Sequence, residues 1–128
     1  MNLKEFRFHE EHDWVRMDGA IAVFGITDYA QKTLGDIVYV ELPAEETVLT
    51  AGEPYAEIES VKAVSDVYAP VSGTVVQVNQ EVIDAPELIN QSPYEDGWLV
   101  RVRLADAAEL EALMTIEEYE AMLSQNEE

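Results

Sequence analysis

Lys62 is the residue of this chain whose setting most strongly suggests chemistry. It is the only Lys or Arg between Lys32 and Arg101, and it follows the run Glu59-Ser60-Val61. A single amine in a long acidic stretch is chemically distinct, and a covalent modification could be directed to it. Such a use would depend on the local structure that presents the amine.

The residues around Lys62 predict a β-hairpin over about residues 54–70. When the chain is folded about the Lys62–Ala63 bond, similar residues face each other: Val61 and Val64, Ser60 and Ser65, Glu59 and Asp66, Ile58 and Val67, Ala56 and Ala69. This symmetry indicates a two-residue loop made of Lys62 and Ala63. Since side chains alternate along a strand, one face should meet the core (Ala56, Ile58, Ser60, Ser65, Val67, Ala69) and the other should meet solvent.

Two features of this hairpin depart from local rules. The loop lacks the Gly or Asn that favours a tight primed turn. Glu59 and Asp66 would also lie directly opposite each other, where like charges are unfavourable. Departures of this kind are expected where function imposes them. A modifying enzyme needs a protruding lysine with small flanking residues and acidic markers, whereas the plainer interpretation is a surface hairpin with a solvated lysine.

The elements that must position this hairpin are mainly β-strands. Apolar alternation and Gly punctuation predict short strands over residues 20–24, 37–42, 54–60, 64–69, 73–78 and 98–104, which is typical of a sandwich or barrel. Asp28 as the N-cap, with Gln31 three residues later and Gly35 as the stop, predicts a short helix. Asp106 with Glu109, and Thr115 with Glu118, predict a C-terminal helical segment over about residues 106–125. In it Ile116, Tyr119, Met122 and Leu123 share an apolar face.

Composition narrows the function classes. The 128 residues suit one domain over 1–128, and the absence of Cys rules out disulfides and cysteine chemistry. The chain has 27 acidic and 7 basic residues, a formal net charge of −20, so we expect neither a nucleic-acid nor an anionic-membrane partner. With no signal peptide or apolar span evident, we expect a cytoplasmic monomer, although a mature mitochondrial protein would have the same features.

Six blocks of sequence, in order, resemble the H protein of the glycine cleavage system. Glu59-Ser60-Val61-Lys62-Ala63 is similar to the lipoylation site of that family. The other blocks are His12-Asp13-Trp14-Val15, the stretch 25–31 with 34–36, Val40-Glu41-Leu42-Pro43, Ala69-Pro70-Val71-Ser72-Gly73 and the stretch 90–98. The resemblance implies a flattened β-sandwich of the lipoyl/biotinyl-carrier type, the barrel-sandwich hybrid, with a few short helices and a C-terminal helix.

The resemblance also implies a carrier without catalytic activity of its own. Lipoate would be attached to Lys62 by an amide bond, with Glu59 and Asp66 as recognition residues. The arm would carry an aminomethyl group from glycine decarboxylase to a tetrahydrofolate-dependent aminomethyltransferase. The other partners would be dihydrolipoyl dehydrogenase and a lipoate-attaching enzyme.

By the same resemblance, Glu11, Asp13 and Asp66 would line a cleft that shelters the loaded arm. Their carboxylates could bind the ammonium group of the load. Two positions depart from the pattern. Asp13 stands where the longer Glu is common, and Thr33 stands where some members carry His.

Other classes of protein fit the sequence less well. In biotinyl carriers the lysine usually lies between two Met, and lipoyl domains of 2-oxoacid dehydrogenases typically carry an acidic residue before the lysine and a flexible linker. A metal site in His9-Glu10-Glu11-His12-Asp13 would need side chains that converge, which a strand or loop does not provide. A carboxylate-pair hydrolase would need a group with a raised pKa, and no sequence feature indicates one. Asn90-Gln91-Ser92 matches a glycosylation acceptor by pattern alone.

Overall fold

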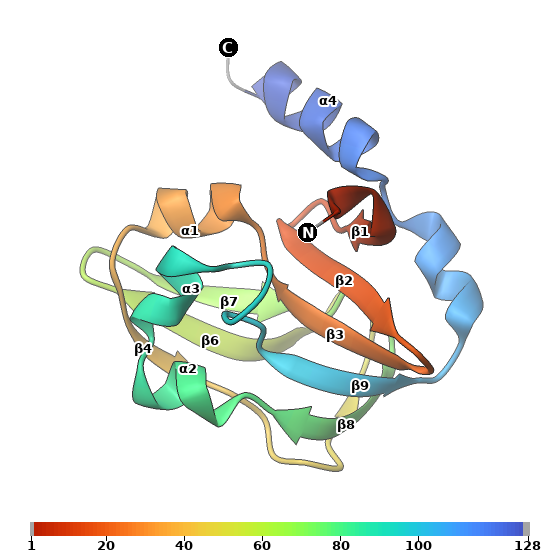
Figure 1. Cartoon of the computed structure of the whole chain (residues 1–128), viewed down its shortest axis with the longest axis horizontal. Coiled ribbons are helices and arrows are strands. Elements are labelled where there is room, and N and C mark those ends of the chain that lie inside the picture. Colours follow the sequence, from red (N-terminus) through yellow and green to blue (C-terminus); the bar gives the residue numbers. More distant parts are fainter. Residues whose placement is uncertain (1, 127–128) are drawn as a thin grey trace.

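Two antiparallel β-sheets form the layers of the protein, as Figure 1 shows. The computed structural model describes residues 2–126. One sheet has six strands in the order β1-β2-β3-β9-β8-β5, and the other has three in the order β4-β6-β7. The strands are β1 (Phe6–Phe8), β2 (Asp13–Asp18), β3 (Ile21–Ile26), β4 (Ile37–Glu41), β5 (Val48–Leu49), β6 (Pro54–Ser60), β7 (Val64–Tyr68), β8 (Gly73–Val78) and β9 (Val100–Leu104).

The main hydrophobic core lies between the two sheets. Val15 and Phe24 of the large sheet and Val40 and Ile58 of the small sheet are all nearly inaccessible to solvent. The Phe24 ring also meets the Tyr55 ring edge-on, with centroids 5.9 Å apart. Each strand places alternate side chains into this layer, because the side-chain period of a strand is two. The expectation of a mainly β-sandwich is therefore confirmed.

Helices join and flank the strands. They are the 3-10 helices η1 (Leu3–Glu5) and η2 (Ala107–Ala112) and the α-helices α1 (Asp28–Leu34), α2 (Gln80–Asp84), α3 (Glu87–Gln91) and α4 (Ile116–Asn126). The sequence analysis did not indicate β1, β2, β5, α2 or α3. Of these, β1, β5, α2 and α3 have at most five residues, too few for an apolar period to be recognised, whereas β2 is as long as β8 and was missed. Within residues 2–126, no helix has both the length and the apolar character needed to span a membrane.

The C-terminal helical segment predicted over about residues 106–125 forms two helices, η2 and α4. Asp106 accepts a hydrogen bond from the Ala108 N–H and caps η2. The backbone of Met114 then exchanges two 2.9 Å hydrogen bonds with Phe8 of β1, which interrupts the helix. Thr115 and Glu118 bond reciprocally to each other's N–H, so the capping box predicted for α4 is confirmed.

Helix α4 packs against a second, aromatic cluster on the outer side of the large sheet. Tyr119 of α4 is buried and stacks on Phe8, with ring centroids 4.9 Å apart. Ile116, Met122 and Leu123 pack against the same cluster, so the apolar face predicted for this helix is confirmed. In Figure 1 this helix lies over β1, away from the β6–β7 hairpin.

Helix α1 begins one residue earlier than the sequence indicated. The N-cap is Thr27, whose hydroxyl accepts the Ala30 N–H at 3.2 Å, whereas Asp28 is the first helical residue. The prediction that Asp28 caps this helix was therefore wrong, because the Thr27 hydroxyl accepts the Ala30 N–H. The helix does end at Gly35, whose φ of 82° and ψ of −154° strongly favour glycine.

Candidate functional site

The β6–β7 hairpin contains Lys62 at its tip, but in a different register from the predicted one. Glu57 lies opposite Asp66, Ile58 opposite Ser65 and Glu59 opposite Val64. The loop residues are therefore Val61 and Lys62 rather than Lys62 and Ala63. The predicted faces are nevertheless right, because the pairing differs by an even number of residues and the side-chain period is two.

Ser60 explains why the chain turns at this point. Its backbone N–H donates to the Ala63 carbonyl at 2.8 Å, and its hydroxyl accepts the N–H groups of Lys62 at 3.3 Å and Ala63 at 3.1 Å. A serine at the start of a turn can close it in this way without a positive φ. Indeed, among residues 2–126 only His12 and Glu46 have positive φ outside glycine. The loop consequently needs neither Gly nor Asn.

The amine of Lys62 is presented to solvent at the tip. Lys62 is exposed, and its neighbours Val61 and Val64 are 69% and 59% exposed. Among residues 2–126 the ion pairs are Lys32–Asp28 and Arg101–Asp18, so no carboxylate engages Lys62 there. Figure 1 shows the hairpin tip at one end of the molecule, beside the connection from α1 to β4. An approaching enzyme could reach this amine without displacing another element.

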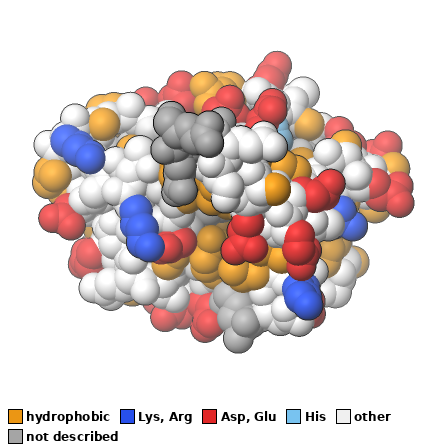
Figure 2. Space-filling view, turned by 90° about the horizontal axis from the view of Figure 1, so that it is seen from above, with side chains coloured by type: hydrophobic (Ala, Val, Ile, Leu, Met, Phe, Trp, Pro, Cys, Tyr) orange, Lys and Arg blue, Asp and Glu red, His pale blue; other side chains and the backbone are white. Residues whose placement is uncertain are grey.

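The true register creates a row of acidic residues across the outer face of the small sheet. Glu41 pairs with Glu57 and Glu57 pairs with Asp66, and all three side chains are exposed. Glu59 lies in the next row, half-buried between Tyr39 and Val64. The predicted opposition of Glu59 and Asp66 was therefore wrong, because the turn at Ser60 shifts the pairing. Figure 2, which views the molecule from above relative to Figure 1, likewise shows more acidic than basic side chains on that face.

The three residues expected to line a cleft differ in their exposure to solvent. Glu11 is exposed in the turn between β1 and β2, Asp66 is exposed on β7, and Asp13 is 1% exposed at the start of β2. Thr33 is exposed on α1. A cleft shared by Glu11, Asp13 and Asp66 would require Asp13 to become accessible.

Asp13 is a buried carboxyl group whose environment favours the neutral form. Burial, with a smaller effect from the charge of Glu11, raises the pKa of Asp13 well above its usual range. Within residues 2–126, Asp13 Oδ2 and the buried Tyr55 hydroxyl have no hydrogen-bond partner. Burial, and to a lesser degree the charge of Asp13, raises the pKa of Tyr55 as well. Asp13 Oδ2 and the Tyr55 hydroxyl are the buried side-chain polar atoms left without a hydrogen-bond partner in the described part of the chain.

The histidines of the early acidic segment make contacts within the protein. His9 Nδ1 accepts the Glu11 N–H at 3.1 Å. His12 Nδ1 lies 2.8 Å from the hydroxyl of Tyr119, and burial lowers the pKa of His12. Residues 2–126 contain no group of three or more His, Cys, Asp or Glu arranged to hold a metal ion. The geometry thus gives the metal-site interpretation no support.

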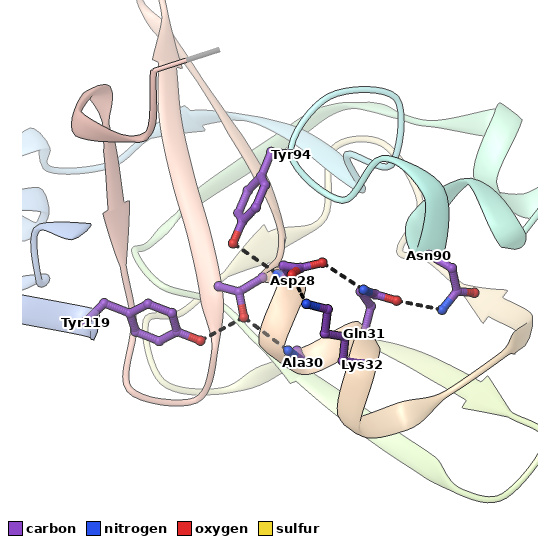
Figure 3. Close-up of polar contacts among 8 residues, drawn as sticks. Asp28, Ala30, Gln31, Lys32, Asn90, Tyr94 and Tyr119 are labelled. Carbon is purple, nitrogen blue, oxygen red and sulfur yellow. Dashed lines mark hydrogen bonds and ion pairs between the residues drawn. The ribbon is translucent and has the colours of Figure 1, made fainter. Parts of the chain in front are cut away.

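The sequence did not single out the polar side chains that fix α1 beside the hairpin. The Asp28 N–H donates to the Tyr94 hydroxyl at 3.0 Å, and the Tyr119 hydroxyl lies 2.8 Å from Thr27 Oγ1 (Figure 3). Further along the helix, Asn90 donates to Gln31 Oε1 at 2.9 Å. The block 90–98 was noted as a family motif, but no local pattern shows that these side chains reach a helix some 60 residues earlier.

Comparisons with known proteins agree on one family. The family described as glycine cleavage H-protein matches residues 6–126. A glycine cleavage system H protein of Carboxydothermus hydrogenoformans is 49% identical over 125 residues, which cover 98% of this chain and 96% of that protein. One from Bacillus cytotoxicus is 55% identical over 120 residues, covering 94% of each.

A solved structure supports the same assignment. The crystal structure of a glycine cleavage system H protein from Mycobacterium marinum superposes with a TM-score of 0.87 at 34% identity. The match covers 94% of this chain and 98% of that one. Sequence and fold thus agree along nearly the whole chain, and the protein belongs to the glycine cleavage H-protein family.

Proposed function

We propose that this protein is the lipoyl carrier of a glycine cleavage system and that lipoate is attached to Lys62. The observation that carries the proposal is an exposed amine on a two-residue turn, within a run similar to the family's lipoylation site. Membership of the H-protein family supports it. The amine nitrogen would form an amide with the activated lipoyl carboxyl group, losing a proton as the activating group leaves.

The residues around Lys62 fit the attachment of such an arm. Ser60 closes the turn through the backbone N–H groups of Lys62 and Ala63, and the Lys62 side chain remains exposed. A bound lipoyl group would supply a disulfide whose sulfurs undergo thiol–disulfide exchange and group transfer. The protein would hold the arm and present it in turn to glycine decarboxylase, the aminomethyltransferase and dihydrolipoyl dehydrogenase.

We propose that the lipoate-attaching enzyme recognises the outer face of the small sheet. Asp66, in the row with Glu41 and Glu57, and Glu59 in the adjacent row supply fixed negative charge next to the turn. Val61 and Val64 add exposed apolar surface between this charge and Lys62. A basic, partly apolar surface on the enzyme would complement the patch.

We also retain Asp13 as a candidate counter-ion for the loaded arm, with Glu11 beside it. A cationic group entering the interior next to Asp13 would favour the ionised carboxylate and satisfy Oδ2, which has no partner among residues 2–126. This role requires the sheets to open near β2, since Asp13 is 1% exposed.

The attachment site is tested by modification of defined variants. Wild-type protein, Lys62→Arg and the matched control Lys32→Arg would each be incubated with a lipoate-attaching enzyme, lipoate and ATP. Intact mass and peptide mapping should place one lipoyl group on Lys62 in the wild type and in Lys32→Arg, and none on Lys62→Arg, because a guanidinium does not form the ordinary amide. Modification mainly at Lys4 or Lys32 would refute the assignment.

The carrier role is tested by adding glycine decarboxylase. Exchange of bicarbonate into glycine should fall to the carrier-free level with Lys62→Arg and remain near wild type with Lys32→Arg. The double variant His9→Ala with His12→Ala should retain this activity if it folds. Full activity of Lys62→Arg together with loss in the histidine variant would instead favour a metal-dependent role.

A further inference from the structure

The turn that contains Lys62 is bonded to and packs against segment 35–37, which joins α1 to β4. The Val61 N–H donates to the Asp36 carbonyl at 3.0 Å, and Ser60 pairs with Ile37. A Cβ atom placed on Gly35 would lie 3.6 Å from Lys62 Cε, so the aliphatic part of Lys62 passes directly over Gly35. The position of the turn therefore depends on the conformation of this segment.

Asn90 of α3 holds that segment on both sides of Asp36. Its Oδ1 accepts the Ile37 N–H at 3.0 Å, and its Nδ2 donates to the Gly35 carbonyl at 2.9 Å. These bonds satisfy backbone groups where the helix has ended and the strand has not fully begun. They also fix the direction of the Asp36 carbonyl, which receives the N–H of Val61.

Asn90 is itself held in place by a polar chain along α1. Its Nδ2 also donates to Gln31 Oε1 at 2.9 Å, and Gln31 Nε2 donates to Asp28 Oδ1 at 2.8 Å (Figure 3). Lys32 pairs with the other carboxylate oxygen of Asp28 at 2.9 Å. The neighbouring Ile89 is fully buried, which anchors the backbone of α3. Asn90 thus makes three hydrogen bonds within the protein, and a glycan attached at this position would disrupt them.

We propose that Asn90 is the positioning residue for Lys62: by fixing segment 35–37 it orders the turn that presents the amine. Asn90 contacts neither the amine nor any atom that reacts, and it acts through Asp36 and Gly35. The kinetic part of this inference rests on the proposed attachment of lipoate to Lys62, whereas the structural part does not. Loss of Asn90 should leave the amine chemically unchanged but less often in its presented position.

The test compares Asn90→Ala with Asn79→Ala in the full-length protein. Asn79 is a matched control, because its Nδ2 donates to the Asp96 and Trp98 carbonyls and its Oδ1 accepts the Glu81 N–H, away from the turn. Both variants lose one accepted and two donated hydrogen bonds. Differences between them therefore report the location of the bonds rather than their number.

Two measurements decide the outcome. Amide hydrogen exchange at Val61 should become about tenfold faster in Asn90→Ala and remain near wild type in Asn79→Ala. With a lipoate-attaching enzyme, lipoate and ATP, Asn90→Ala should raise KM for the protein about fivefold and leave kcat nearly unchanged, since only a fraction of molecules presents the turn correctly. Asn90→Asp keeps the oxygen that faces Ile37 but loses both donors, so it should show the same changes and serves if Asn90→Ala does not fold.

The proposal is overturned if Val61 exchange and KM in the Asn90 variants match those of Asn79→Ala. It is also overturned if kcat falls while KM is unchanged, because positioning the turn should affect recognition. If wild-type protein is not modified on Lys62, the proposed function fails, and the exchange of the Val61 amide still decides the role of Asn90.

Discussion

Replacing Asp66 by Asn should stabilise the protein while slowing its modification. Asp66 lies directly opposite Glu57, and both carboxylates are exposed. Charges about 7 Å apart repel by about 0.6 kcal/mol in water. Screening reduces this repulsion to about 0.5 kcal/mol at 0.01 M salt and about 0.25 kcal/mol at 0.15 M. The variant should gain stability by these amounts, since Asn has nearly the same shape without the charge.

Urea denaturation at the two salt concentrations measures this gain. With a slope of about 1.5 kcal/mol per molar urea, the midpoint should rise by about 0.3 M at low salt and by less than 0.2 M at 0.15 M. Asp96→Asn is the control, because Asp96 is exposed but lies far along the chain from the hairpin. Lipoylation of Asp66→Asn should be slower than that of Asp96→Asn.

The two halves of this prediction can fail separately. Lower stability of Asp66→Asn at both salt concentrations would show that Asp66 makes a stabilising contact and that the like-charge argument is wrong. Normal modification of a stabilised variant would remove Asp66 from the recognition surface and leave the register argument intact.

Three further substitutions test the structure around the site. Ser60→Ala should lower the unfolding free energy by about 1 kcal/mol, because the turn loses its acceptor, whereas Ser65→Ala should change it little in the same urea titration. Gly25→Ala should lower stability by about 1–3 kcal/mol or prevent folding, since the new Cβ would lie 2.5 Å from Cε2 of the buried Trp14, and circular dichroism melting would show it. For Asp13, the raised pKa in the folded state means that its stabilising contribution is complete below about pH 4 and is lost as the pH rises through the folded pKa. The stability of wild type relative to Asp13→Asn should therefore fall with rising pH in parallel denaturation series, and a constant difference would contradict the burial argument.

Much of the fold followed from local sequence signals. The capping box of Thr115 and Glu118 predicted the start of α4, because its two hydrogen bonds form between residues three apart. Gly35 marked the end of α1 because its backbone conformation suits glycine. Apolar alternation also identified strands such as β6 and β8.

The register of the β6–β7 hairpin could not be predicted from such local signals. Alternation assigned Ile58 and Val67 to the core and Glu57 to solvent, and these assignments were right. It could not choose between two registers that differ by an even number of residues, because both place the same side chains on the same face. The choice is made by the hydroxyl of Ser60, whose bonds to the backbone close the turn one residue earlier than symmetry suggested.

The sequence by itself thus determined the family pattern, the β-rich class and the lysine at the hairpin tip, since these depend on residue type and short-range spacing. Tertiary structure alone decided that Asp13 is enclosed between the sheets and that Asn90 supports the segment beneath Lys62. Both outcomes depend on contacts between residues more than 50 positions apart or on burial by the opposite sheet. Such contacts form only when the layers pack, so they cannot be predicted from a local sequence pattern.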